Sequence, residues 1–268
     1  MSFVEKLHKK NIIAKPGFNR WLVPPASIAI HLCIGSVYAW SMFNPALIKV
    51  LGVVSSSGDD WSLSQVVWIF SVAIVSLGLA AAYAGKWLEK VGPRMVGFFA
   101  ACCWGGGFII GSLGIYLQEN GVVINLSLPF VSPDEITMQL GLYLLYLGYG
   151  VIGGVGLGLG YVSPVSTLIR WFPDRRGMAT GMAIMGFGGG AMIAKFTIDK
   201  LLETFYKVPE YLGTLDSVEL ITEGGRRFAE ISGSMIEVVV VAANEVSRMI
   251  VPGDPGVYIV GTGSSGAA

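Results

Sequence analysis

The stretch WSLSQVVWIFSVAIVSLGLAAAYAG, from Trp61 to Gly85, runs for 25 residues without a charged side chain. About 20 apolar residues in a helix cross the hydrocarbon core of a bilayer. Inside lipid every backbone N–H and C=O must be paired, and a helix achieves this within a single segment. The stretch therefore predicts a membrane-spanning helix.

Uncharged stretches of similar length recur along the first 200 residues. They are Trp21–Ile48, Met95–Gln118, Gln139–Ile169 and Gly177–Ala194. Only 13% of the residues are charged and the mean hydropathy is +0.64, whereas soluble domains carry about 25% charged residues. The short alternating strands of a membrane barrel are missing from the sequence. We expect an all-α polytopic membrane protein with a five-helix bundle over residues 21–200, its spans at about 21–48, 61–85, 95–118, 139–169 and 177–200.

The basic residues of this region lie mainly in the loops on one side of the predicted membrane. If the spans alternate, one side carries Lys6, Lys9, Lys10, Lys15, Arg20, Lys86, Lys90, Arg94, Arg170, Arg175 and Arg176. The two short loops on the opposite side have only Lys49 as a basic residue. Basic loops stay in the cytoplasm, so residues 1–20 are expected to form a cytoplasmic tail of a protein in the cell (inner or plasma) membrane. The net charge is zero, which gives no indication of a nucleic-acid partner.

Residues 201–268 are more polar and contain no uncharged stretch of spanning length. We expect an extracytoplasmic loop or insert of mixed structure, with a helix around Arg226–Met249 and a strand at Val257–Val260. The last eight residues, Gly261–Ala268, have the composition of a loop. The expectation is therefore a fragment, truncated before a sixth helix.

The sequence GKWLEKVGPR, Gly85–Arg94, joins the second and third spans. It resembles the inner-loop signature of the major facilitator superfamily, although Pro93 and Met95 stand where basic residues are commoner. In that family the loop holds neighbouring helices and helps to gate the inner mouth. The resemblance implies this role for Gly85, Glu89, Lys90, Gly92 and Arg94. The simpler alternative is a basic loop that only faces the lipid headgroups.

The sequence RWFPDRRG, Arg170–Gly177, joins the fourth and fifth spans, where Arg175 and Arg176 are expected to anchor the inner side. Together with Tyr38–Phe43 and Gly156–Val165, it resembles the oxalate/formate antiporter family, a neighbour of the monocarboxylate transporters. The resemblance covers about residues 15–200. It implies the first five of twelve helices, with transport by alternating access around a midplane site.

Candidate binding residues follow from the same resemblance, because the family's substrate cage includes aromatic residues of helices one, four and five. Tyr38, Trp40 and Tyr161 are the matching candidates, and Phe187 is a weaker one. His31 is the ionisable residue well inside the first span, four and seven residues before Gly35 and Tyr38 and therefore on their helical face. It is a candidate for contact with the anion or for proton relay. The alternatives are aromatic side chains that only pack, and a neutral histidine bonded to a carbonyl.

We therefore expect the N-terminal part of a secondary transporter for small organic anions such as oxalate, formate or monocarboxylates. The expected partners are the anion, the lipid bilayer and the missing C-terminal half of the carrier, which in the family supplies the main cationic groups. The alternatives are a proton-coupled carrier of another solute, and a membrane sensor or scaffold with an external domain. The sequence shows no convincing catalytic triad or phosphate loop, and Cys33, Cys102 and Cys103 lack metal-ligand spacing. Neither an enzyme nor a cofactor is expected.

Overall fold

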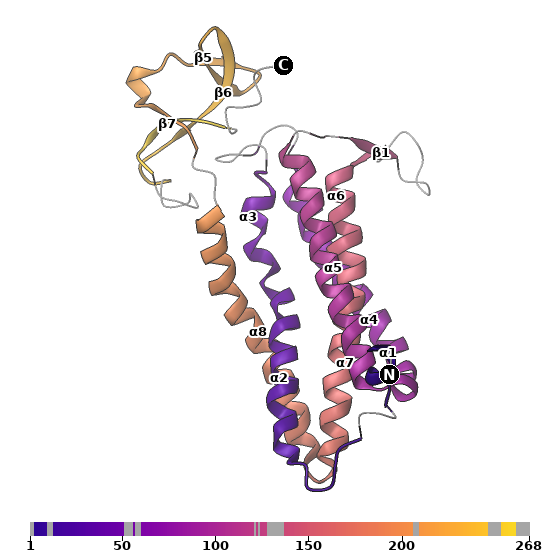
Figure 1. Ribbon diagram of the computed structural model, residues 1–268. Helices are drawn as coiled ribbons and strands as arrows, with labels where there is room; N and C mark the ends of the chain where they lie inside the picture. Colours follow the sequence, from indigo (N-terminus) through magenta and orange to yellow (C-terminus); the bar gives the residue numbers. More distant parts are fainter. Residues whose placement is uncertain are drawn as a thin grey trace.

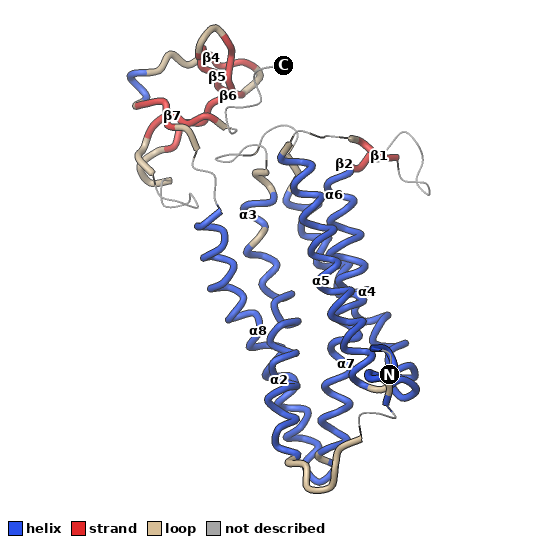
Figure 2. Tube along the Cα trace, in the orientation of Figure 1, coloured by secondary structure: helices blue, strands red, loops and turns tan. Residues whose placement is uncertain are grey.

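The computed structural model describes residues 3–9, 13–50, 56, 60–120, 122, 124–127, 137–205, 209–245 and 253–260. Long helices lie side by side, and a small sheet lies beyond the end of the last one (Figures 1 and 2). Within the described residues, five helical segments are long and apolar enough to cross a membrane. They are Arg20–Met42, Leu63–Val91, Pro93–Glu119, Leu140–Trp171 and Pro173–Phe205. The prediction of five spanning helices followed by a mixed segment is confirmed.

The first span changes helix type along its length. After the short helix α1 (Phe3–Leu7), the span consists of η2 (Arg20–Leu22), α2 (Val23–Ile34) and the 3₁₀ segment η3 (Gly35–Met42), and the short helix α3 (Asn44–Leu47) follows it. The change falls at Gly35, where an added Cβ would collide with the backbone of Phe187. The missing side chain therefore lets the first and last spans approach closely.

The second and third spans reverse direction in one residue. Helix α4 (Leu63–Val91) ends at Gly92, which has φ of 94°, and α5 (Pro93–Glu119) follows immediately. Glycine adopts this backbone conformation without the steric cost of a side chain. At the other end of α4, Ser62 and Gln65 form a capping box.

The fourth span is interrupted by a π-helical segment. It consists of α6 (Leu140–Leu145), η4 (Tyr146–Gly153) and α7 (Gly154–Trp171), and the two-stranded pair β1 (Asn125–Ser127) and β2 (Thr137–Gln139) precedes it. The turn η5 (Pro173–Arg175) then leads into α8 (Arg176–Phe205). Helix α7 contacts α2, α4, α5 and α8, so it is the central helix of the bundle.

The C-terminal segment forms one antiparallel sheet in the order β3-β7-β6-β5-β4. Its elements are β3 (Tyr211–Gly213), the turn η6 (Leu215–Ser217), β4 (Ile221–Glu223), β5 (Arg226–Ile231), β6 (Ser234–Val241) and β7 (Gly256–Ile259). The predicted strand near Val257–Val260 is confirmed as β7.

The predicted helix around Arg226–Met249 is wrong, because its described part, up to Glu245, contains the hairpin β5–β6. Ser232 and Gly233, between these strands, both have positive φ, as the two-residue turns of hairpins require. The run Val238–Val241 consists of β-branched residues, which favour strands. Turn residues and β-branching therefore favour a hairpin over a helix in this segment.

Helix α2 begins at one end of the bundle, where α4 also meets α5 and α7 meets α8. We call this end the basic end. In Figure 1 the sheet lies near the opposite end of the helices. This arrangement follows from the alternating direction of the five spans.

Candidate functional site

The candidate site is an aromatic cluster where α2, η3, α7 and α8 meet. Phe187 lies at its centre, with ring centroids 5.2 Å from Tyr38, 5.4 Å from Tyr161 and 6.2 Å from His31. The rings of His31 and Tyr161 are 5.6 Å apart, and Phe70 of α4 lies 6.4 Å from Tyr38. We call His31, Tyr38, Tyr161 and Phe187 the aromatic cluster.

Three members of the cluster lie at the same depth in the bundle. His31, Tyr161 and Phe187 are each ten or eleven residues from the basic end of their spans at Arg20, Trp171 and Arg176. At 1.5 Å per residue this is about 15–17 Å, roughly half the thickness of the hydrocarbon core. These three members therefore lie near the middle of the spanning region.

His31 is the innermost member of the cluster. It is completely buried, and its Nε2 lies 3.4 Å from the carbonyl oxygen of Tyr161. Within the described chain its Nδ1 has no hydrogen-bond partner. In the tautomer with the proton on Nε2, His31 donates to the carbonyl of Tyr161 and so connects α2 to α7.

Tyr38 is the exposed member of the cluster, at 51% of its full accessibility. Its ring edge meets Phe187 at an interplanar angle of 74°. His31, Gly35 and Tyr38 all contact α8, as their spacing of four and three residues predicts. A polar hydroxyl group on an accessible ring is the chemistry that an anion site needs.

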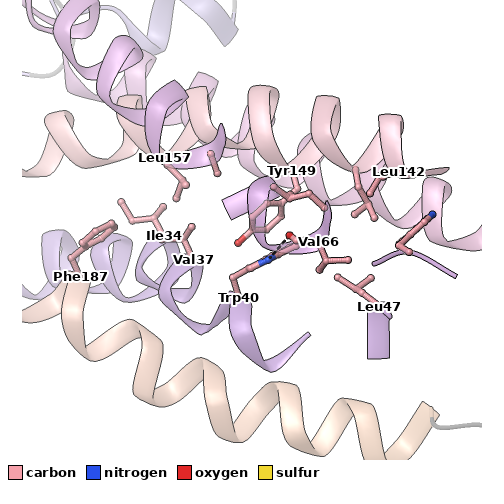
Figure 3. Close-up of a cluster of buried hydrophobic side chains, with 13 residues drawn as sticks. Ile34, Val37, Trp40, Leu47, Val66, Leu142, Tyr149, Leu157 and Phe187 are labelled. Carbon is pink, nitrogen blue, oxygen red and sulfur yellow. Dashed lines mark hydrogen bonds between the residues drawn. The ribbon is translucent and has the colours of Figure 1, made fainter. Parts of the chain in front are cut away.

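Trp40, in contrast, lies outside the cluster. Its side chain is 5% exposed, stacks on Tyr149 with centroids 4.3 Å apart, and donates a hydrogen bond from Nε1 to the Val66 carbonyl at 3.2 Å. Figure 3 shows Trp40 and Tyr149 together, with Phe187 at the far end of the core. The five candidates from the sequence, with Phe187 the weaker one, are therefore divided between the four-membered aromatic cluster and one packed tryptophan.

A shallow groove of about 300 Å³ leads from Tyr161 towards the basic end. It is lined by Tyr161, Val162, Val165, Ser166, Ile169 and Arg170, all of α7. A larger cavity of about 1,020 Å³ lies between α2, α5 and α7. Its wall is mainly apolar, with Lys15 and Arg94 among the lining residues.

The loop residues predicted from the sequence meet other segments at the basic end. Glu89 accepts a hydrogen bond from Arg170 at 3.2 Å through its carboxylate, and one from Lys9 Nζ at 2.6 Å through its backbone carbonyl. Gly92 makes the one-residue reversal. The other loop residues are placed as follows: Gly85 has open space beside its Cα, while Lys90, Arg94, Arg175 and Arg176 are exposed.

Sequence reasoning missed a second set of contacts at this end. Arg20 donates two hydrogen bonds to Asp174, at 2.9 and 3.1 Å, and its guanidinium carbon lies 4.8 Å from the centre of the Phe172 ring. These contacts join the start of η2 to the turn between α7 and α8. The sequence did contain a signal for this ion pair, because Arg20 and Asp174 carry opposite charges and are predicted on the same side of the membrane.

Long apolar helices packed side by side, five of them within the described residues, define a polytopic membrane protein. The family model described as Major Facilitator Superfamily matches residues 30–198. The chain therefore belongs to the major facilitator superfamily, a family of transporters.

Individual relatives agree with this assignment. The uncharacterized MFS-type transporter YhjX of Escherichia coli is 31% identical over 69% of this chain and 38% of its own length. The oxalate:formate antiporter of Oxalobacter formigenes is 27% identical over 65% of the chain and 34% of its own. The apicoplast pyruvate carrier 1 of Toxoplasma gondii is 27% identical, with coverage of 62% and 32%. The chain thus spans about a third of the length of these relatives.

Proposed function

We propose that the chain forms the N-terminal helical bundle of a secondary active transporter that moves small organic anions, such as oxalate, formate or monocarboxylates, by alternating access. The observation that carries the proposal is the aromatic cluster at mid-depth, formed by residues of the first, fourth and fifth spans. The names of two relatives, an oxalate:formate antiporter and a pyruvate carrier, support carboxylates as the substrate class.

The chemistry of the cluster suits a carboxylate. An anion in the middle of a membrane needs hydrogen-bond donors and surroundings from which water is excluded. Tyr38 and Tyr161 offer hydroxyl donors on apolar rings, and Phe187 between them offers an apolar wall. We propose that these residues bind the anion, with His31 behind them and Trp40 fixing the helix that carries Tyr38.

A second bundle is part of the proposal. The relatives are about three times as long as the part of them that this chain matches. We propose that further helices provide the opposite wall of the site and cationic partners for the carboxylate. The exposure of Tyr38, at 51%, supports this proposal, because it leaves that side of the aromatic cluster open to a further protein wall.

The proposed orientation follows the distribution of charge. The basic end carries Arg20, Arg170, Arg175 and Arg176, so the positive-inside rule supports a cytoplasmic N-terminal tail over residues 1–20. The spanning bundle then covers residues 21–200, and residues 201–268, with the sheet, lie outside a cell membrane. The loop residues Gly85, Glu89, Lys90, Gly92 and Arg94 are proposed to help gate the cytoplasmic mouth.

The test is exchange of labelled oxalate, formate, lactate and pyruvate by vesicles containing the carrier expressed from its complete reading frame. Tyr38→Phe removes one hydroxyl and retains the ring. A hydrogen bond to a charged group contributes about 1.5–3 kcal/mol, so KM for the transported anion should rise at least about tenfold. Tyr83→Phe is the matched control, because Tyr83 lies on α4 with its side chain 86% exposed.

Two results would contradict the proposal. If wild-type vesicles exchange none of the four anions, the substrate class is wrong. If Tyr38→Phe and Tyr83→Phe give the same KM as the wild type, Tyr38 is not in the binding site. A membrane sensor is the second candidate, favoured by the folded sheet after α8, and it predicts ligand binding by residues 209–260 without any solute movement.

A further inference from the structure

One side of α7 carries a groove that extends from the aromatic cluster to the basic end. Tyr161 lines it at the cluster, Ser166 in the middle, and Arg170 at the basic end. The nine residues from Tyr161 to Arg170 correspond to about 13–14 Å along the helix axis. The groove therefore joins the proposed binding site to one face of the membrane.

The groove has the chemistry of a path for an anion. Val165 and Ile169 provide its apolar walls, whereas Tyr161 and Ser166 provide hydroxyl groups. Arg170 is the cationic residue of the lining and its side chain is 62% exposed. A guanidinium group offers several N–H donors in a geometry that matches a carboxylate.

Arg170 already holds a carboxylate in this structure. Its Nη2 lies 3.2 Å from Oε1 of Glu89, and the Glu89 side chain is 69% exposed. Ion pairs between exposed side chains contribute only about 0–1 kcal/mol, because water solvates both partners well. A second carboxylate that reaches Arg170 therefore competes with Glu89 at little cost.

We propose that this groove is a second anion subsite, in which Arg170 exchanges Glu89 for the carboxylate of the transported anion as it passes between the aromatic cluster and the basic end. The inference rests on the proposed transport of small carboxylates. It assigns Arg170 a binding role and Glu89 the role of a competing carboxylate that occupies Arg170 between transport events. Because the subsite lies at one end, its effects are confined to one side of the membrane.

The experiment measures KM for labelled oxalate and formate from each side, in vesicles of both orientations that contain the carrier from its complete reading frame. Arg170→Gln should raise KM about two- to fivefold on the side of the basic end and leave KM on the opposite side unchanged. Glu89→Gln removes the competing charge and should lower KM on that same side about threefold. Lys86→Gln is the control, because it removes a positive charge at the same end without touching the groove.

The outcomes separate this inference from the proposed function. If the wild type exchanges oxalate or formate but Arg170→Gln changes neither KM, or changes both equally, the subsite is refuted and the transport proposal stands. If the wild type exchanges no carboxylate, both fail. If Arg170→Gln is unstable in detergent, the Glu89→Gln variant tests the subsite by itself. An unchanged KM for Glu89→Gln on the side of the basic end then contradicts the subsite.

Discussion

Gly105, Gly106 and Gly107 of α5 allow a stringent test of how the bundle packs, because three consecutive glycines lie in different surroundings. A Cβ added to Gly105 or Gly106 would meet no atom within 4 Å. A Cβ added to Gly107 would lie 2.6 Å from the carbonyl oxygen of Gly148 and 2.9 Å from the Cα of Gly153. The same alanine substitution is therefore harmless at two positions and obstructed by backbone at the third.

The magnitude follows from the contact. Ordinary carbon contacts begin near 3.4 Å, so α5 and η4 must separate by most of an ångström to admit the methyl group of Gly107→Ala. Overpacking of this kind costs about 1–3 kcal/mol. Gly106→Ala shares the gain in helix propensity, up to about 1 kcal/mol, and that gain cancels when the two variants are compared. Gly107→Ala should therefore be less stable than Gly106→Ala by about 1–3 kcal/mol.

The assay is thermal unfolding of the detergent-solubilised protein, followed by loss of the monodisperse peak in size-exclusion chromatography. At roughly 2–4 °C per kcal/mol for a chain of this size, Gly107→Ala should unfold about 2–12 °C below Gly106→Ala. Equal unfolding temperatures for the two variants would show that α5 and η4 are not in backbone contact at Gly107. A lower temperature for Gly106→Ala than for Gly107→Ala would refute the packing altogether.

Three further predictions use the same stability assay. Ser62→Ala removes the side-chain cap of α4 and should lower stability by about 0.5–2 kcal/mol; a neutral effect would mean that the cap is not formed. Trp40→Phe removes the donor to the Val66 carbonyl and should cost about 0.5–1.5 kcal/mol, and an unchanged unfolding temperature would contradict that hydrogen bond. For Arg20 and Asp174, a double-mutant cycle of Arg20→Gln and Asp174→Asn should give a coupling free energy of at most about 1 kcal/mol, because both side chains are partly exposed. This coupling should weaken as salt is added. A coupling above about 2 kcal/mol that does not depend on salt would refute this estimate.

The spanning segments and the cap of α4 were predictable because they depend on local sequence. A long uncharged run satisfies its backbone within one helix, and Ser62 is close enough in sequence to cap the helix it precedes. The sheet was less predictable, because Arg226–Val241 alternates polar and apolar residues imperfectly. Two-residue turns at Gly224-Gly225 and Ser232-Gly233 have positive φ at both positions. They form the successive hairpins β4–β5 and β5–β6.

The division of the candidate site has a simple geometric origin. Tyr38 and Trp40 are two residues apart, and side chains at that spacing do not share a helical face. Tyr38 therefore meets Phe187, while Trp40 turns into the core against Tyr149. A comparison of motifs selects both residues, since motif matching disregards the direction in which each side chain leaves the helix.

The sequence by itself determined that the chain forms long membrane-spanning helices, five of them within the described residues, and that one end of the bundle is basic. The physical reason is that hydrocarbon excludes charges and unpaired backbone groups whatever the helices pack against. Only the tertiary structure decided that Phe187 joins His31, Tyr38 and Tyr161, and that Glu89 meets Arg170 at the mouth of a groove. These contacts join residues 26 to 156 positions apart. They depend on which helix faces meet. Glycines decide this by allowing the backbones of two helices to approach closely, which no single segment of sequence specifies.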